Sequence, residues 1–216
     1  MKLTHDILNK PIVFNSENIN IIYIECSKLF YTICNNFIEF NDCLELYKDN
    51  KKLNPSKSIC IITDYFNLNI NTTKNLSKLY LSLTQGINSI EKNNFNNYFI
   101  NFIQTISFES NYNLTYDLEI NYNEIYKSVS LQIDQRDNLT FLEKLISYIS
   151  ISRDLNNYEL FVLINIKVFM NDNDIEELYK YCIYNKINLL LLETKQSTIL
   201  HNEKVTIIDK DFCIID

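Results

Sequence analysis

The sequence predicts an α/β protein with a mostly parallel sheet in one part, the head, and an inserted helical part, the leg. Four short apolar runs lie at residues 20–25, 58–64, 160–165 and 188–193. Each has the length and composition of a buried strand. Helical patterns separate several of these runs, and such alternation is typical of a parallel sheet. Between the second and third runs, apolar residues recur mainly at spacings of three and four, which predicts helices.

The head elements follow in chain order. The strand at 20–25 precedes a helix with Ser27 as its expected N-cap. Residues 44–47 alternate as a half-exposed strand, and a later helix is expected from about 174 to 184, after an N-cap at Asn171. Both chain ends are expected to add hairpins at the sheet edge, 2–7 with 12–14 and 205–208 with 212–215.

The leg is expected to span residues 71–154, which leaves 1–70 and 155–216 as the head. Its helices are expected on either side of a polar break at 91–97, with a further helix at 139–151. A projecting leg has little of its own chain to cover its apolar stripes. Another subunit is therefore a candidate partner.

Composition and charge exclude several classes of protein. The formal net charge is −7, so any contact with DNA requires a local basic patch or an assembly. The 6 cysteines have no C-x-x-C spacing and are typical of reduced core residues. His5 and His201 lack the spacing of zinc ligands. The chain begins with no signal peptide and has no apolar run that would span a bilayer, so a cytoplasmic protein with no membrane partner is expected.

The strand followed by a helix near the N-terminus raises the question of a nucleotide site. Such a site needs glycines, which let backbone amides approach phosphates. Residues 25–29 contain no glycine, and the single glycine, Gly86, lies in the predicted leg. The sequence therefore has neither a phosphate-binding loop nor a dinucleotide fingerprint.

A divalent-metal nuclease is the enzyme hypothesis. Asp64 ends one predicted strand, and Glu193 with Lys195 ends another. Such residues can hold a metal ion and polarise water. The alternative is a pair of solvated strand ends, because these residue types are common wherever buried strands emerge into solvent.

Two charged clusters are candidate binding sites. A basic turn at 48–57 contains the candidate DNA-binding residues Lys48, Lys51, Lys52 and Lys57. Such a turn is either only solvated or, when a symmetric ring brings copies together, a phosphate-binding surface. An acidic segment between leg helices is either a solvated face or a source of the oxygen ligands that calcium prefers. Its candidate metal-binding residues are Glu109, Asp117, Glu119, Asn123 and Glu124.

Four stretches, at 61–71, 160–165, 188–193 and 208–212, resemble in order and spacing a known family over nearly the whole chain. This is the type II-A CRISPR-associated spacer-acquisition family, the ring-forming Csn proteins that bind DNA ends. The resemblance implies a head like that of P-loop ATPases without a working nucleotide site. It also implies a homotetrameric ring on free ends of double-stranded DNA, bound calcium, and cooperation with the CRISPR integrase complex and the RNA-guided nuclease.

The resemblance also assigns residues. Acids of the family's calcium-binding region are matched by Asp117, Glu119 and Glu124, with Glu109 matching an acid slightly upstream. Asn123 stands where an acid is common, which implies weaker calcium binding. Lys52 matches a family lysine, and the basic patch is expected to have shifted toward Lys51 and Lys57.

The expected function is therefore a non-catalytic ring that binds DNA ends in spacer acquisition. The alternatives are the nuclease and an adaptor of the same pathway that contacts only proteins. The negative net charge favours the adaptor. If Lys51→Glu with Lys52→Glu left DNA binding unchanged, that result would support the adaptor.

Overall fold

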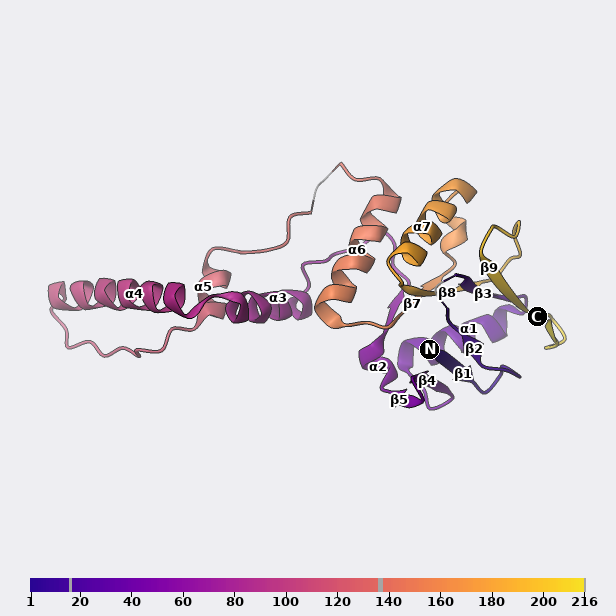
Figure 1. The fold of residues 1–216 in the computed structure, drawn as a ribbon, viewed down its shortest axis with the longest axis horizontal. Coiled ribbons are helices and arrows are strands. Elements are labelled where there is room, and N and C mark those ends of the chain that lie inside the picture. The colour runs from indigo at the N-terminus through magenta and orange to yellow at the C-terminus, as the bar shows by residue number, and fades with distance from the viewer. Residues whose placement is uncertain (16, 136–137, 216) are drawn as a thin grey trace. The chain divides into compact units, whose positions relative to one another are not determined.

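The computed structural model describes residues 1–15, 17–135 and 138–215. The chain divides into two compact units (Figure 1). The head unit comprises Met1–Asn69 and Arg136–Asp216, and the leg unit comprises Ile70–Gln135. No helix of the described residues is long and apolar enough to cross a membrane.

The head is built on a sheet with the strand order β10-β9-β3-β8-β7-β6. Its strands are β3 (Ile19–Ile24), β6 (Ile59–Ile62), β7 (Leu160–Ile164), β8 (Asn188–Glu193), β9 (Glu203–Ile208) and β10 (Ile214–Ile215). All neighbouring pairs are parallel except β9 with β10. The predicted mostly parallel sheet is confirmed. The C-terminal hairpin also forms, but β9 joins the parallel body and only β10 is antiparallel.

The parallel sheet is covered on both faces, which explains why its strands are continuously apolar. On one face, α6 (Phe141–Asn156) and α7 (Asp172–Tyr184) bury Leu145, Ile149 and Leu178. On the other face, α1 (Ser27–Glu39) packs together with residues of a second, smaller sheet. The N-cap of α1 is Cys26, and no side chain caps this helix, so the prediction of Ser27 as N-cap is wrong by one residue.

The second sheet is antiparallel, with the order β2-β1-β4-β5. Its strands are β1 (Lys2–His5), β2 (Ile12–Val13), β4 (Leu44–Lys48) and β5 (Lys51–Leu53). The N-terminal hairpin is therefore confirmed, although it extends this sheet rather than the parallel one. The predicted basic turn is itself structured, because it contains β5 and the short helix α2 (Pro55–Ser58).

Helix α6 lies in the head, whereas the sequence predicted that the leg extends to residue 154 and includes this helix. Leu145 and Ile149 are completely buried in the same cluster as Phe161 and Leu163 of β7. The helical stripe at 139–151 therefore belongs to the core of the head, and the leg unit ends at Gln135. Periodicity alone identifies an apolar helix face but not the surface that covers it.

The leg unit contains α3 (Thr73–Gly86), α4 (Ser89–Glu109) and α5 (Tyr122–Ser128). The predicted polar break at 91–97 lies inside α4. The helical structure is instead interrupted at Ile87 and Asn88. Asn88 accepts a hydrogen bond from the Glu91 amide at 2.8 Å. This N-cap starts a new helix despite the polar residues that follow.

The buried side chain of His5 makes the stability of the head dependent on pH. The Ile7 amide donates to His5 Nδ1 at 3.2 Å, so the ring is neutral in this arrangement. Burial lowers the pKa of His5, and the nearby Asp6 offsets this only in part. A lowered pKa favours the neutral form, so the unfolded chain takes up a proton first as the pH falls.

We therefore expect the folded head to lose stability relative to a His5→Gln variant as the pH falls through about 6.5, the ordinary pKa of histidine. Urea unfolding between about pH 5.5 and 8 gives the free energy of unfolding of each protein, and its slope against pH is compared between the two. The control is His201→Gln, because His201 is exposed. Equal slopes for the wild type and His5→Gln would contradict the assignment.

Candidate functional site

The carboxyl edge of the parallel sheet has no room for a phosphate loop. Parallel α/β sheets bind ligands at this edge, and in nucleotide-binding proteins a glycine-rich loop joins the first strand to its helix. Here β3 ends at Ile24 and α1 begins at Ser27, so only Glu25 and Cys26 connect them. The geometry agrees with the absence of a phosphate-binding motif in the sequence.

A buried ion pair joins the segment after β7 to the first residue of β9. Lys167 Nζ is 2.6 Å from Glu203 Oε1, and both side chains are nearly inaccessible. Lys167 also donates to the Tyr23 hydroxyl at 2.9 Å and to Ser197 at 3.1 Å. Burial by itself would lower the pKa of Lys167, but its hydrogen bonds to Glu203 and Tyr23 outweigh burial and raise it. The charges of Lys167 and Glu203 therefore compensate each other inside the head.

The proposed nuclease residues are not brought together. Asp64 follows β6 and Glu193 ends β8, and β7 lies between these two strands. Asp64 accepts a hydrogen bond from the Phe66 amide at 3.0 Å, whereas Glu193 is 2% exposed and accepts one from the Lys167 amide at 3.1 Å. Among the described residues, no group of three histidines, cysteines or acids is placed to hold a metal ion.

The four candidate DNA-binding lysines lie on or beside one hairpin of the smaller sheet. Asp49 and Asn50 join β4 to β5 with positive φ at both residues, as a two-residue type I′ turn requires. Lys48 forms an ion pair with Glu159 at 2.7 Å, and Lys52 forms one with Glu45 at 2.6 Å.

Lys51 and Lys57 differ from these two because, within the described parts of the chain, neither forms an ion pair. Both side chains are exposed. Lysines on an edge strand such as β5 also deter edge-to-edge pairing of sheets. The role of the four lysines in DNA binding stays a prediction. Of these four, Lys51 and Lys57 are the two that form no ion pair among the described residues.

The leg helix α4 has no buried residue, and most of its side chains are exposed. Its N-terminal half contacts the rest of the leg through Phe95, whose ring lies 5.7 Å from that of Tyr122. The same stripe continues to Phe102 and Ile106, which are 53% and 44% exposed. The apolar face of α4 therefore extends beyond the part that its own unit covers.

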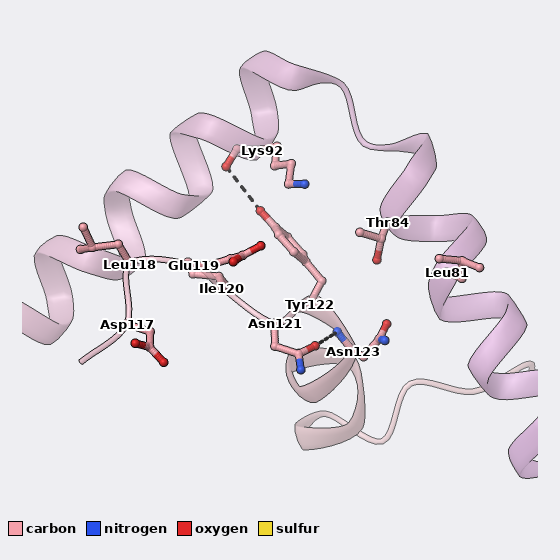
Figure 2. A pocket seen from close by; sticks show the side chains of 10 residues that line it. All are labelled: Leu81, Thr84, Lys92, Asp117, Leu118, Glu119, Ile120, Asn121, Tyr122 and Asn123. Atoms are coloured by element: carbon pink, nitrogen blue, oxygen red, sulfur yellow. Dashed lines mark hydrogen bonds between the residues drawn. The ribbon is translucent and has the colours of Figure 1, made fainter. Parts of the chain in front are cut away.

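The acidic segment borders a cavity of about 720 Å³ within the leg unit (Figure 2). Asp117, Glu119 and Asn123 line this cavity, together with Lys92 of α4. The other two candidate metal ligands lie elsewhere on the leg. Glu109 ends α4, and Glu124 forms an ion pair with Lys127 at 2.7 Å. The prediction of calcium binding by these five residues stays a prediction.

Sequence reasoning missed Lys167, Tyr23 and Lys92. Lys167 and Tyr23 are separated by most of the chain, and no motif links them. Lys92 lies in the stretch at 91–97 whose polar residues predict a break between helices. Asn88 could have been recognised in the sequence as a helix N-cap. That would have placed Lys92 in the first turns of α4, the helix that borders the acidic segment.

Comparisons with known proteins agree on a family and a fold. The family model described as "CRISPR-associated protein (Cas_Csn2)" matches residues 36–212. The CRISPR-associated protein Csn2 of Enterococcus faecalis is 23% identical over 175 residues, which cover 78% of this chain and 77% of that protein.

Among solved structures, a nucleotide-free ATP-binding cassette from an ABC transporter is similar, with a TM-score of 0.50 and 14% identity, covering 96% of this chain and 87% of that one. An ABC transporter cassette in its ADP conformation has a TM-score of 0.48 and 13% identity, covering 92% and 79%. The first likeness confirms the P-loop-ATPase-like fold.

Burial raises the pKa of Glu193 to about 7, although hydrogen bonds and the nearby Lys167 act in the opposite direction. A raised pKa means that the folded protein takes up a proton before the unfolded chain does. As the pH falls from about 7 toward 4.5, the wild type should gain stability relative to Glu193→Gln, by roughly 3 kcal/mol at most. Chemical unfolding of both proteins across this range measures the difference, and a constant difference would contradict the assignment.

Proposed function

This chain belongs to the Csn2 family of CRISPR-associated proteins, and from this premise we propose that it forms a non-catalytic homotetrameric ring on free ends of double-stranded DNA during spacer acquisition. The observation that carries the proposal is the uncovered apolar stripe of α4. A ring has a topological route to specificity, since a closed ring enters linear DNA only at an end. Captured ends would then pass to the CRISPR integrase complex and the RNA-guided nuclease.

The leg favours assembly because it has almost no core of its own. Of the residues in the leg unit, the buried ones are Ile70, Asn75, Tyr80 and Tyr122. Two of these are tyrosines, and another is an asparagine that donates to the Ile70 carbonyl at 2.8 Å. Exposed apolar patches of this extent mark protein interfaces. A second copy of the chain is the proposed cover, because a closed ring requires contacts between identical subunits.

The charge of the chain favours contact with DNA only through a local surface. A net charge of −7 repels phosphate overall, so binding must come from clustered lysines. Lys51 and Lys57 are exposed and have no ion-pair partner among the described residues. A symmetric ring would repeat Lys51 and Lys57 in every subunit. Several weak contacts with phosphates would then act together.

Substitutions on the exposed stripe of α4 test the proposed assembly. Phe102→Asp with Ile106→Asp should convert the tetramer into smaller species, because carboxylates cannot be desolvated in an apolar interface without a large cost in free energy. The control is Asn97→Asp with Gln104→Glu, which adds the same charge at exposed polar positions of the same helix. Sedimentation equilibrium measures the mass. An unchanged mass for Phe102→Asp with Ile106→Asp would show that this stripe is not the interface.

Binding to linear and circular duplexes tests the proposed contact with DNA ends. Linear duplexes should be shifted in a gel at moderate salt, and closed circles of the same sequence should not. Lys51→Glu with Lys57→Glu should weaken binding by about tenfold or more and reduce its salt dependence. The matched control is Lys28→Glu with Lys144→Glu, because both residues are exposed on helices of the head.

The outcomes separate the alternatives. Equal binding of linear and circular DNA would remove the topological mechanism. No binding of either form would favour the adaptor. Cleavage of linear DNA in magnesium that Glu193→Ala abolishes would favour the nuclease.

A further inference from the structure

The segment that joins α4 to α5 has the residue pattern of a β-strand. Apolar and polar side chains alternate strictly through residues 112–120, which is typical of a strand with one apolar face. The apolar positions are Tyr112, Leu114, Tyr116, Leu118 and Ile120, and the polar positions between them are Asn113, Thr115, Asp117 and Glu119. We propose that this segment pairs with the same segment of a second copy of the chain, as antiparallel strands centred on Tyr116. The inference rests on the ring proposed above, because it names a contact that joins two of its subunits.

In the single chain the segment has no partner strand. Residues 111–120 lie in no helix or strand. Within the described residues, the backbone of 113–120 makes no hydrogen bond. The chain bends at Leu118 and Glu119, so pairing requires these two residues to become extended.

The apolar side chains of the segment are also uncovered. Tyr112 is 79% exposed and Leu118 is 66% exposed, while Leu114 and Tyr116 are 49% and 40% exposed. Unpaired backbone groups next to an uncovered apolar face are the features with which an extended segment adds to another strand. Both features lie in the same nine residues.

Both ends of the segment are fixed within the leg unit. It leaves α4 after Glu109. At its other end, Tyr122 donates to Asn96 of α4 at 2.7 Å, and its ring lies 5.7 Å from that of Phe95. The segment is therefore a loop that returns from the end of α4 to its first half (Figure 1). A loop with fixed ends loses less conformational entropy on pairing than a free tail does.

The side-chain pattern fits a second copy in antiparallel orientation. Pairing about Tyr116 places every apolar position of 112–120 opposite an apolar position. On the other face Asn113 lies opposite Glu119, and Thr115 lies opposite Asp117, so no acid faces an acid. Parallel pairing in register would place each acid opposite its own copy, which is destabilising. A two-fold axis relates identical segments in the antiparallel way.

The stripe of α4 provides a cover for the paired segments. A ribbon of two strands is marginally stable in water unless its apolar face packs against another element. Phe102 and Ile106 of α4 belong to the same unit and are 53% and 44% exposed. Packing of the ribbon on this stripe would bury both apolar surfaces in one interface.

Single cysteines test the pairing and its register. Cys213→Ser serves as the background, because Cys213 is an exposed native thiol. In this background Tyr116→Cys places two thiols opposite each other across the two-fold axis, with Cα atoms about 4.5–5.5 Å apart, within reach of a disulfide. We expect a disulfide-linked dimer to form at least about tenfold faster than with Asn113→Cys in the same background.

Asn113→Cys is the matched control because residue 113 is exposed in the same segment. In the proposed register, the two copies of residue 113 lie six positions apart along the ribbon, about 20 Å. A mixture of Asn113→Cys chains and Glu119→Cys chains should form disulfides between the two kinds of chain, since these residues face each other. Equal rates for Tyr116→Cys and Asn113→Cys would overturn the proposal.

Sedimentation equilibrium of the same variants in reducing agent separates this proposal from the ring. A tetramer that forms no disulfide at residue 116 on oxidation would overturn the pairing and leave the ring standing. A dimer that forms this disulfide but never assembles further would support the pairing and contradict the ring. A monomer without the disulfide would contradict both.

Discussion

Burial of the parallel sheet on both faces is the constraint from which the rest of the head follows. Every residue of β3 is buried, so helices must cover one face and other elements the opposite face. On one side α6 and α7 fill this role, and on the other α1 and the smaller sheet do. The lysine hairpin β4–β5 owes its place to this requirement, because Leu44 and Leu46 of β4 are part of the second core.

The carboxyl edge of this sheet differs from the edge of a nucleotide-binding sheet, although the fold is similar to that of an ATP-binding cassette. The connection of Glu25 and Cys26 leaves no loop for phosphates. The Lys167–Glu203 pair is held by Tyr23, Ser197 and Tyr179 through hydrogen bonds of 2.9 to 3.1 Å. Breaking such a buried pair from one side typically costs about 3–5 kcal/mol, because the remaining charge is left without a partner. This network therefore stabilises a charged pair in the interior of the head.

The leg, unlike the head, has few buried residues. Its helices are joined by a few tyrosine contacts. Tyr80 donates a 2.6 Å hydrogen bond to the Leu131 carbonyl, and its ring lies at a tilt, 5.3 Å from the ring of Tyr126. Such contacts order the unit without burying much apolar area. A part of a protein that leaves its apolar stripe uncovered is suited to binding other subunits, whereas the doubly covered sheet of the head is suited to rigidity. The proposed assembly surface and the proposed DNA contact therefore lie in different units of the chain.

The sequence by itself determined the strands of the parallel sheet, the main helices and the missing phosphate loop, because these depend on local patterns of apolar residues and glycines. It also determined the family resemblance. It did not determine that α6 belongs to the head, since an apolar stripe such as Leu145 and Ile149 has the same spacing whichever surface covers it.

Nor could the sequence determine which charges are compensated. Lys48 and Lys51 are alike in sequence, but only Lys48 meets an acid, Glu159, from a distant part of the chain. Tyr122 of α5 likewise contacts α4 through a hydrogen bond to the Lys92 carbonyl, and no sequence motif links these two residues. Pairing of charges depends on distances between residues far apart in the sequence, and only the tertiary structure decides those distances.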